Sequence, residues 1–209
     1  MTPLPKHPEK AQLILHAALK VFSEKGIEKG TIAEIAKEAG LGKGTVYQYY
    51  NSKADIYFAI EVSKAETWDL LFQTTMAKPI SCSQKLELLI SEGVAQTIHA
   101  GDAILVIFEI WSHTIRGLVD ENSFSPMTIM YEKFHSELVA LLEQGIAKGE
   151  FREMQPSGVA TMIIAFMDGI SIQMLMLKDQ FEKNNWVEQS IQSLLNGLIS
   201  KPSKDKEIQ

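Results

Sequence analysis

The sequence predicts an all-α protein of nine helices. Almost every segment of the 209 residues repeats its apolar side chains at intervals of three and four, and no segment alternates apolar and polar residues as a half-buried strand does. Capping residues, glycines and prolines stand at the ends of these segments. The composition, with 45% hydrophobic and 22% charged residues, is typical of an ordinary globular protein.

The first four helices carry clear boundary signals. Gly26 ends the first helix in the manner of a C-terminal glycine, and Thr31 with Glu34 forms a capping box for the second. Ser52 and Asp55 have the spacing to cap the fourth helix. In chain order, the nine helices are expected at about residues 9–25, 32–39, 43–49, 53–77, 83–99, 102–118, 126–148, 156–178 and 186–199.

Prolines and polar loops set the boundaries of the later helices. The fourth helix ends before Pro79, because the residue before a proline disfavours the helical conformation. Pro126 and Pro156 each suit the first turn of a helix. Asn185, with Glu188 three residues later, is expected to cap the last helix.

The segment from Thr31 to Lys53, TIAEIAKEAGLGKGTVYQYYNSK, predicts two short helices that cross. Ala36 is small enough to let the helices approach, Gly40 can make the turn, and Val46 fills the joint between them. Ile35 and Leu41 are apolar residues at the other spacings that such a crossing needs. The second helix then exposes lysine, threonine and tyrosine side chains, as a helix that enters the DNA major groove does. The segment therefore predicts a DNA-binding function.

The charge distribution agrees with a nucleic-acid contact at the N-terminal end only. The chain has a net charge of −6, but residues 1–55 hold eight Lys/Arg against six Asp/Glu. The remaining residues hold twelve Lys/Arg against twenty Asp/Glu. A phosphate backbone is therefore expected to meet the N-terminal segment.

Residues 10–60 resemble the N-terminal region of the TetR family of bacterial transcriptional regulators. The resemblance lies in an apolar helix ending FSEKG, the pattern T-x-x-x-I-A-x-x-A-G, and KGTVYQYYNSK running into Asp55-Ile56. It implies a three-helix helix-turn-helix domain at residues 1–55 and a helical ligand-binding and dimerisation domain at residues 56–200. The polar tail at residues 201–209 is expected to be disordered.

The resemblance also implies which residues contact an operator. The positions that match the family's pattern are Thr31, Lys43, Gly44, Thr45, Tyr47, Tyr49 and Lys53. The chemistry of these residues suits DNA binding, because Lys43 can neutralise a phosphate or bond to guanine, and Thr45 can bond to a base edge or contact a thymine methyl. Gly42 departs from the pattern, because a serine or threonine is common there, so the recognition helix lacks a side-chain cap.

The helix at residues 156–178 is apolar on almost all sides and therefore has to be covered all round. Together with the stripe of Ile191, Leu194, Leu195 and Leu198 in the last helix, it predicts a homodimer through a four-helix interface. The alternative is a helix buried wholly within one subunit. Its length also suits a membrane span, but the polar residues inside it, Asp168 among them, favour a buried helix.

The resemblance implies a ligand cavity in the C-terminal domain. The candidate lining residues are Trp68, Phe72, Phe108, Glu109, Trp111, His113, Met130, Phe134, Met162 and Phe166. Aromatic residues around a carboxylate suit a small neutral or cationic hydrophobic effector. Plain core packing of the aromatics, and an ion pair between Glu109 and His113, remain open as alternatives. Asp168 is a further polar residue inside an apolar run, and a bond across a helix contact would explain it.

Rival functions find less support in the sequence. Glu132-x-x-His135 has the spacing of a di-iron ligand pair, but no second such motif is present, so neither a metal nor a cofactor is expected. GLGKGT at residues 40–45 lacks the order of a phosphate-binding loop. The sequence thus predicts a cytoplasmic repressor that is not an enzyme, with a helical protein-interaction module or an activator without effector as the alternatives. The single cysteine, Cys82, fits a reducing compartment.

Overall fold

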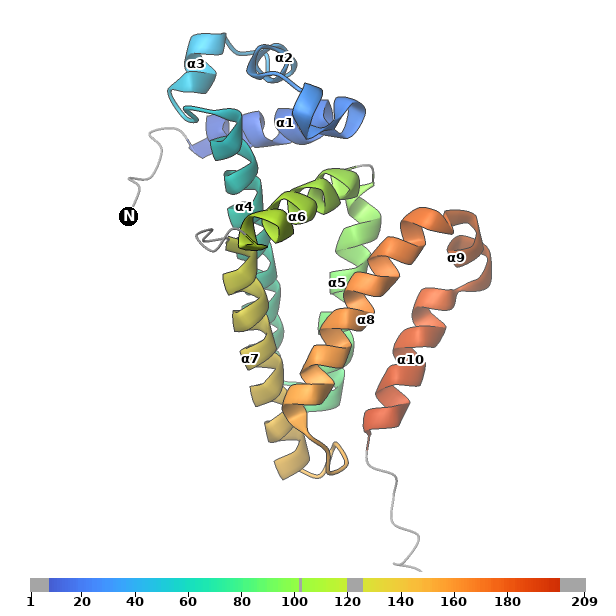
Figure 1. Ribbon diagram of the computed structural model, residues 1–209. Coiled ribbons are helices and arrows are strands. Elements are labelled where there is room, and N and C mark those ends of the chain that lie inside the picture. The colour runs from blue at the N-terminus through green and yellow to red at the C-terminus, as the bar shows by residue number, and fades with distance from the viewer. Residues whose placement is uncertain (1–7, 102, 120–125, 200–209) are drawn as a thin grey trace, which may run out of the picture. The chain divides into compact units, whose positions relative to one another are not determined.

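The computed structural model describes residues 8–101, 103–119 and 126–199, and over these residues it forms helices and no strand (Figure 1). The helices are α1 (Pro8–Lys29), α2 (Ile32–Glu38), α3 (Lys43–Tyr47), α4 (Lys53–Met76), α5 (Cys82–Ala100), α6 (Ala103–Val119), α7 (Pro126–Ala147), α8 (Pro156–Met176), α9 (Lys178–Asn184) and α10 (Trp186–Leu198). The prediction of an all-α fold is confirmed. The predicted disordered tail at residues 201–209 lies outside the described residues.

The described chain has ten helices where the sequence predicted nine, because the short helix α9 follows α8. Asn185 joins α9 to α10 in the left-handed conformation, with φ 51° and ψ 37°, and its side chain makes no capping bond. Asn185 thus precedes the last helix as predicted, but the predicted side-chain cap is absent. An asparagine tolerates the left-handed region better than most residues, and here that property makes a sharp turn.

The chain divides into two compact units. The first contains the described residues up to Thr67 and from Ala100 to Ile129, and the second contains Trp68–His99 and the described residues from Met130 onward. This division differs from the expected boundary after residue 55, because α6 packs with the N-terminal helices. Helix α4 contributes its first part to one unit and its second part to the other.

The core of the first unit joins α1, α2 and α3 to the start of α4 and to α6. Ile14, Ile35, Val46 and Ile56 are fully buried in it, and Val106 from α6 packs in the same cluster. Residues predicted to lock the two short helices thus do so, with Gly40 at φ +64° in the turn between them. The predicted caps at Thr31–Glu34 and Ser52–Asp55 are also present.

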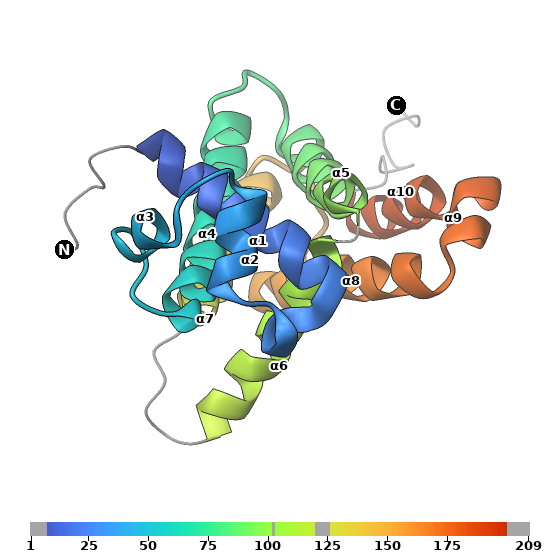
Figure 2. The same cartoon turned by 90° about the horizontal axis from the view of Figure 1, so that it is seen from above.

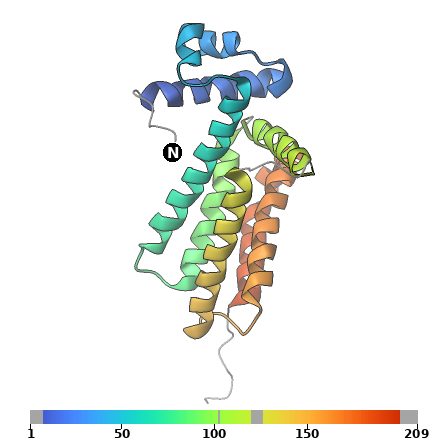
Figure 3. The same cartoon turned by 60° about the vertical axis from the view of Figure 1, so that its left-hand side comes forward.

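The second unit is a bundle in which α5, α7, α8 and α10 surround a larger core (Figure 3). Leu86, Leu142, Ile163 and Leu195 supply one buried side chain from each of these helices. The loop after α7 is tied to the end of α10, because the Arg152 amide donates to the Leu198 carbonyl over 3.0 Å and its side chain donates to the Gly197 carbonyl over 2.7 Å.

The single cysteine lies inside the second unit. Cys82 is 1% exposed, and its thiol donates to the Gln144 side chain over 3.3 Å. Burial, together with the nearby Glu150 carboxylate, raises the pKa of the Cys82 thiol. The thiol is therefore held as a neutral, weakly reactive group.

We predict that Gly145→Ala destabilises the second unit. A Cβ atom at Gly145 would lie 2.2 Å from the ring of Phe151 and 3.2 Å from the Cβ of Cys82. Phe151 is only 2% exposed, so its ring has no room to move. Overpacking of this kind costs about 1–3 kcal/mol, which denaturant unfolding followed by circular dichroism measures.

Gly197→Ala is the matched control, because Gly197 lies in α10 with nothing within 4 Å of the position of an added Cβ. Alanine there is expected to leave stability unchanged or to raise it by up to about 1 kcal/mol, since it favours the helix. Equal effects of the two substitutions would contradict the packing described here.

Candidate functional site

Helix α3 presents a small polar surface on the first unit, and Figure 2 shows the helix at the outer edge of that unit next to α2. Lys43 and Gly44 are exposed, and Tyr47 is 44% exposed. The Lys43 ammonium lies 5.8 Å from the centre of the Tyr47 ring, within reach of a cation–π interaction. Thr45 and Tyr49 are half-buried beside them. Five of the seven predicted DNA contacts therefore lie on or next to one short helix.

Val46 holds this surface in place. Its side chain is fully buried against the core of the first unit, while its neighbours Thr45 and Tyr47 remain accessible. Gly42 opens α3 without a side-chain cap, as the sequence indicated, and the Gly42 carbonyl accepts from the Thr45 amide over 2.9 Å. A helix of five residues is far too short to be stable alone, so burial of Val46 is what keeps it formed.

Thr31 is exposed, and its hydroxyl belongs to the capping box of α2. The hydroxyl donates to the Glu34 carboxylate over 2.8 Å and accepts from the Glu34 amide over 3.3 Å. The bond from Lys25 and those from Thr31 together lower the pKa of Glu34 to about 2. An exposed ion pair between Lys25 and Glu34 thus links the first turn of α2 to α1.

Lys53 is engaged with the backbone at the end of α1. Its ammonium donates to the carbonyls of Ile27, Glu28 and Gly30, over 2.5, 2.8 and 3.3 Å. These carbonyls belong to a helix end that needs donors, and a cation there is also favoured by the helix dipole. The structure thus gives Lys53 a role in positioning the helix end, and its contact with phosphate stays a prediction.

Glu109 of α6 caps the N-terminal side of the last turn of α1, which begins at Ile27. Gly26 interrupts α1 with φ +78°, a conformation that side chains rarely adopt, so the helix restarts at Ile27. The Glu109 carboxylate accepts from the Ile27 amide over 2.9 Å. The turn that leads into α2 is therefore held at one end by a carboxylate and at the other by the Lys53 ammonium.

The predicted ligand residues on α6 lie in the first unit. The His113 ring stacks on Tyr57 of α4 with ring centres 6.3 Å apart, and Phe108 meets Trp111 edge to face at 4.9 Å. Glu109 bonds to Ile27, so the alternative of an ion pair between Glu109 and His113 is not what the structure shows.

The other predicted ligand residues lie in the second unit, mostly within its core. Phe72 and Phe134 are 7% and 9% exposed, and the Trp68 ring packs 5.1 Å from that of Phe134. Phe166 is half-buried against the same core, whereas Met162 is 63% exposed on α8. The ten predicted residues therefore divide between the two units, and their contact with a ligand stays a prediction.

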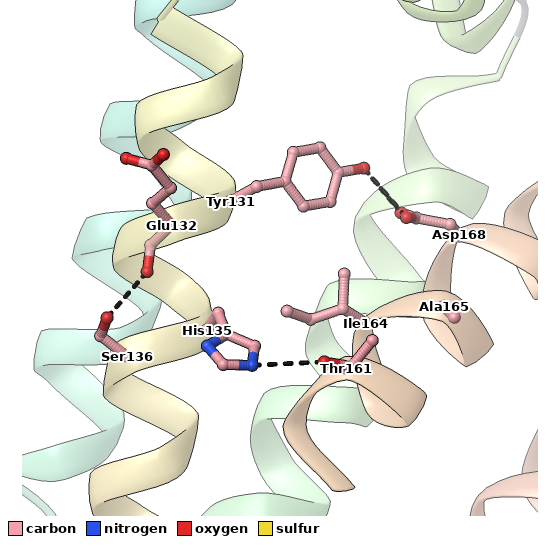
Figure 4. Close-up of a pocket in the computed structure, with 8 residues that line it drawn as sticks. All are labelled: Tyr131, Glu132, His135, Ser136, Thr161, Ile164, Ala165 and Asp168. Atoms are coloured by element: carbon pink, nitrogen blue, oxygen red, sulfur yellow. Dashed lines mark hydrogen bonds between the residues drawn. The ribbon is translucent and has the colours of Figure 1, made fainter. Parts of the chain in front are cut away.

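A cleft of about 500 Å³ lies instead between α7 and α8 (Figure 4). Polar contacts join the two helices at both ends of the cleft: the Tyr131 hydroxyl lies 3.0 Å from each carboxylate oxygen of Asp168, and His135 Nε2 lies 3.3 Å from the Thr161 hydroxyl. Ile164 lies between these contacts, and Glu132 lies at the rim with its side chain directed away from α8. The cleft combines an apolar floor with a carboxylate at one end.

The sequence pointed to parts of this cleft without assembling it. Asp168 was noted as a polar residue in an apolar helix, and Glu132 with His135 as an incomplete metal motif. The missed signal is spacing, because Tyr131 and His135 are four apart on α7, and Thr161, Ile164 and Asp168 follow at intervals of three and four on α8. No group of three or more His, Cys, Asp or Glu side chains among the described residues is arranged to hold a metal ion.

Two family models together match most of the chain. The profile of bacterial regulatory proteins of the tetR family matches residues 14–60, and that of the BetI-type transcriptional repressor C-terminal region matches residues 83–198. The uncharacterized HTH-type transcriptional regulator YvdT of Bacillus subtilis (strain 168) is 30% identical over 145 residues, which are 69% of this chain and 71% of that protein.

Two further proteins are similar along nearly the whole chain. The HTH-type transcriptional regulator TtgR of Pseudomonas putida is 25% identical over 200 residues, covering 92% of this chain and 93% of TtgR. The crystal structure of FadR from Bacillus subtilis in complex with stearoyl-CoA has a TM-score of 0.72 and 21% identity, covering 89% of this chain and 98% of FadR. At this identity the likeness to FadR shows a shared fold.

We predict that Glu109→Ala loosens the turn between α1 and α2. Loss of the carboxylate leaves the Ile27 amide without its acceptor, which costs about 1–3 kcal/mol for a partly buried group. Hydrogen exchange measured by mass spectrometry on peptides covering Gly26–Gly30 is expected to accelerate.

Glu109→Gln is the matched variant, because its side-chain oxygen still accepts from the amide without the charge. It is expected to lose less protection than Glu109→Ala. Glu28→Ala removes an exposed carboxylate from the same turn and is expected to leave exchange unchanged. Unchanged exchange in Glu109→Ala would show that the bond does not stabilise the turn.

Proposed function

Because the chain belongs to the TetR family of bacterial transcriptional regulators, we propose that it is a repressor that binds a pseudo-palindromic operator as a homodimer. A small hydrophobic effector bound by the second unit would release it from the DNA. The observation that carries the proposal is helix α3, which exposes Lys43, Gly44 and Tyr47 while Val46 anchors it in the core. Action on DNA makes the cytoplasm the expected location.

The DNA contact would use the exposed side of α3. Lys43 is placed to meet a phosphate or a guanine edge, and the Tyr47 hydroxyl and ring lie beside it. Tyr49 follows α3 and Thr31 precedes α2, and both side chains suit contacts to the phosphate backbone. The amides at the starts of α2 and α4 would add donors for phosphates, because helix N-termini favour anions.

A second copy of the chain would cover α8. This helix is long and apolar enough to span a membrane, with a mean hydropathy of 1.7 over its most apolar window, yet only 28% of that window is buried. Met162, Ile172, Leu175 and Met176 are all exposed on it. In α10, Ile191, Leu195 and Leu198 are buried within the subunit, so of these two helices α8 is the one that exposes a longer apolar face. Association of two copies would bury it and pair two α3 helices, which one short helix needs for specific reading.

Effector release requires a ligand that binds the DNA-free conformation more tightly than the DNA-bound one. Glu109 and Lys53 fix the turn that precedes α2, so a displacement of α6 or α4 would reach the DNA-binding helices through this turn. An activator that uses the same operator contact is the alternative function. It would be distinguished by raised transcription from the bound promoter.

We predict that Lys43→Ala weakens operator binding about tenfold and lowers its salt dependence. A homodimer loses two phosphate neutralisations, so the slope of log K against log salt concentration is expected to fall by about two. Fluorescence anisotropy on DNA from upstream of the protein's own gene, at several salt concentrations, measures both quantities.

Lys183→Ala is the control for this experiment, since Lys183 is an exposed lysine on α9 in the second unit. It changes the net charge equally and is expected to leave affinity and slope unchanged. The proposed role of α3 is rejected if Lys43→Ala binds as the unchanged protein does. If random DNA binds as tightly as the upstream DNA, specific operator recognition there is rejected.

We predict that Ile172→Lys dissociates the homodimer. The substitution places a charge on the exposed apolar face of α8, where burial in an interface would be costly. Sedimentation velocity is expected to show a monomer, and operator affinity should fall with it. Leu70→Lys is the control, because Leu70 is 65% exposed on α4 and is expected to leave the dimer intact. A monomeric parent protein would refute the dimer.

A further inference from the structure

The cleft between α7 and α8 is lined partly by apolar side chains, and the carboxylate of Asp168 in it faces Tyr131. Ile164 and Ala165 lie along its floor, and Asp168 lies at one end with the Tyr131 hydroxyl directed at it (Figure 4). Its volume, about 500 Å³, is within the range of small-molecule sites. Ala165 lies seven residues before Ile172 and so on the same side of α8, which means that the cleft borders the exposed apolar face of this helix. The pair of Asp168 and Tyr131 distinguishes the cleft from that face.

Asp168 is a partly buried carboxylate whose described hydrogen bonds come from Tyr131. Burial raises the pKa of Asp168 to about 6, and the Tyr131 bond opposes this shift. Burial and the neighbouring Asp168 charge also raise the pKa of Tyr131, so the phenol remains neutral and donates. Near neutral pH the cleft therefore contains a negative charge that burial destabilises and that a cation would stabilise.

The described lining of the cleft supplies no lysine or arginine to balance this charge. Lys133, which neighbours the lining residues in sequence, bonds to Asp69 of α4 and lies 4.0 Å from Glu137. His135 Nε2 is engaged with the Ser157 carbonyl at 3.1 Å and with the Thr161 hydroxyl. An anionic head group would thus meet a carboxylate and would find no lysine or arginine among the lining residues, whereas an ammonium would meet Asp168 and the Tyr131 ring.

We propose that this cleft binds an organic cation, with its charged group beside Asp168 and Tyr131 and its apolar body along Ile164 and Ala165. The inference rests on the proposed function, because it names the chemical class of effector for the regulator. It separates this chain from the FadR structure that holds stearoyl-CoA, since that ligand carries phosphates and no cation.

The test uses isothermal titration calorimetry on the full-length protein at pH 7.5. The probes are decyltrimethylammonium and decanoate, which share a ten-carbon chain length and differ in the sign of their charge, both below micelle-forming concentrations. The cation is expected to bind at least about tenfold more tightly than decanoate, because one favourable charge contact is worth about that factor.

Three variants locate the binding. Asp168→Asn keeps the shape of the side chain and is expected to weaken the cation about tenfold or more. Ala165→Trp fills the cleft and is expected to abolish binding. Glu143→Gln removes an exposed carboxylate of α7 outside the cleft lining and is expected to change nothing. If Ala165→Trp does not fold, the comparison of Asp168→Asn with Glu143→Gln still decides the question.

The inference is overturned if decanoate binds as tightly as the cation, or if Asp168→Asn and the parent protein bind the cation equally. Operator binding is measured separately with and without the cation. Binding that depends on Asp168 but leaves operator affinity unchanged supports the cation site and rejects effector release. Release of operator by decanoate but not by the cation rejects the cation as the effector and leaves the proposed release by a hydrophobic effector intact.

Discussion

Burial of Val46 is the constraint on which the proposed DNA-binding surface depends. Helix α3 has five residues and no side-chain cap, so its own hydrogen bonds cannot keep it helical. Its stability comes from packing on α2, whose buried Ile35 and Ala36 share a core with residues of α1. The buried residues therefore keep α3 helical, and through it they position the exposed residues of that helix.

Local signals in the sequence were sufficient to predict the first three helices. Thr31 with Glu34, the turn at Gly40 and the buried Val46 act over a few residues, and the structure confirms each of them. At Asn185 the sequence predicted the start of the last helix but not its left-handed conformation, since the same residue type suits both a helix cap and a left-handed joint. Only the neighbouring helices decide between these uses.

Contacts between distant residues were beyond the reach of sequence spacing. Glu109 stands on α6, 82 residues from the Ile27 amide that it caps, and no local pattern links the two. The sequence also favoured aromatic residues as ligand contacts, and several of these fill the core of the second unit. Polar residues in apolar helices pointed instead to the cleft between α7 and α8, because burial of Asp168 has a cost that packing alone does not offset.

The position of Cys82 has a consequence for the chemistry of the whole molecule. As the one cysteine in the chain, enclosed at 1% exposure, it cannot form a disulfide with a second copy without unfolding its surroundings. Oxidants and electrophiles are expected to react slowly with this sulfur, because it is buried and protonated. The proposed association of two copies would thus have no covalent form, and it would depend on protein concentration in oxidising and reducing surroundings alike.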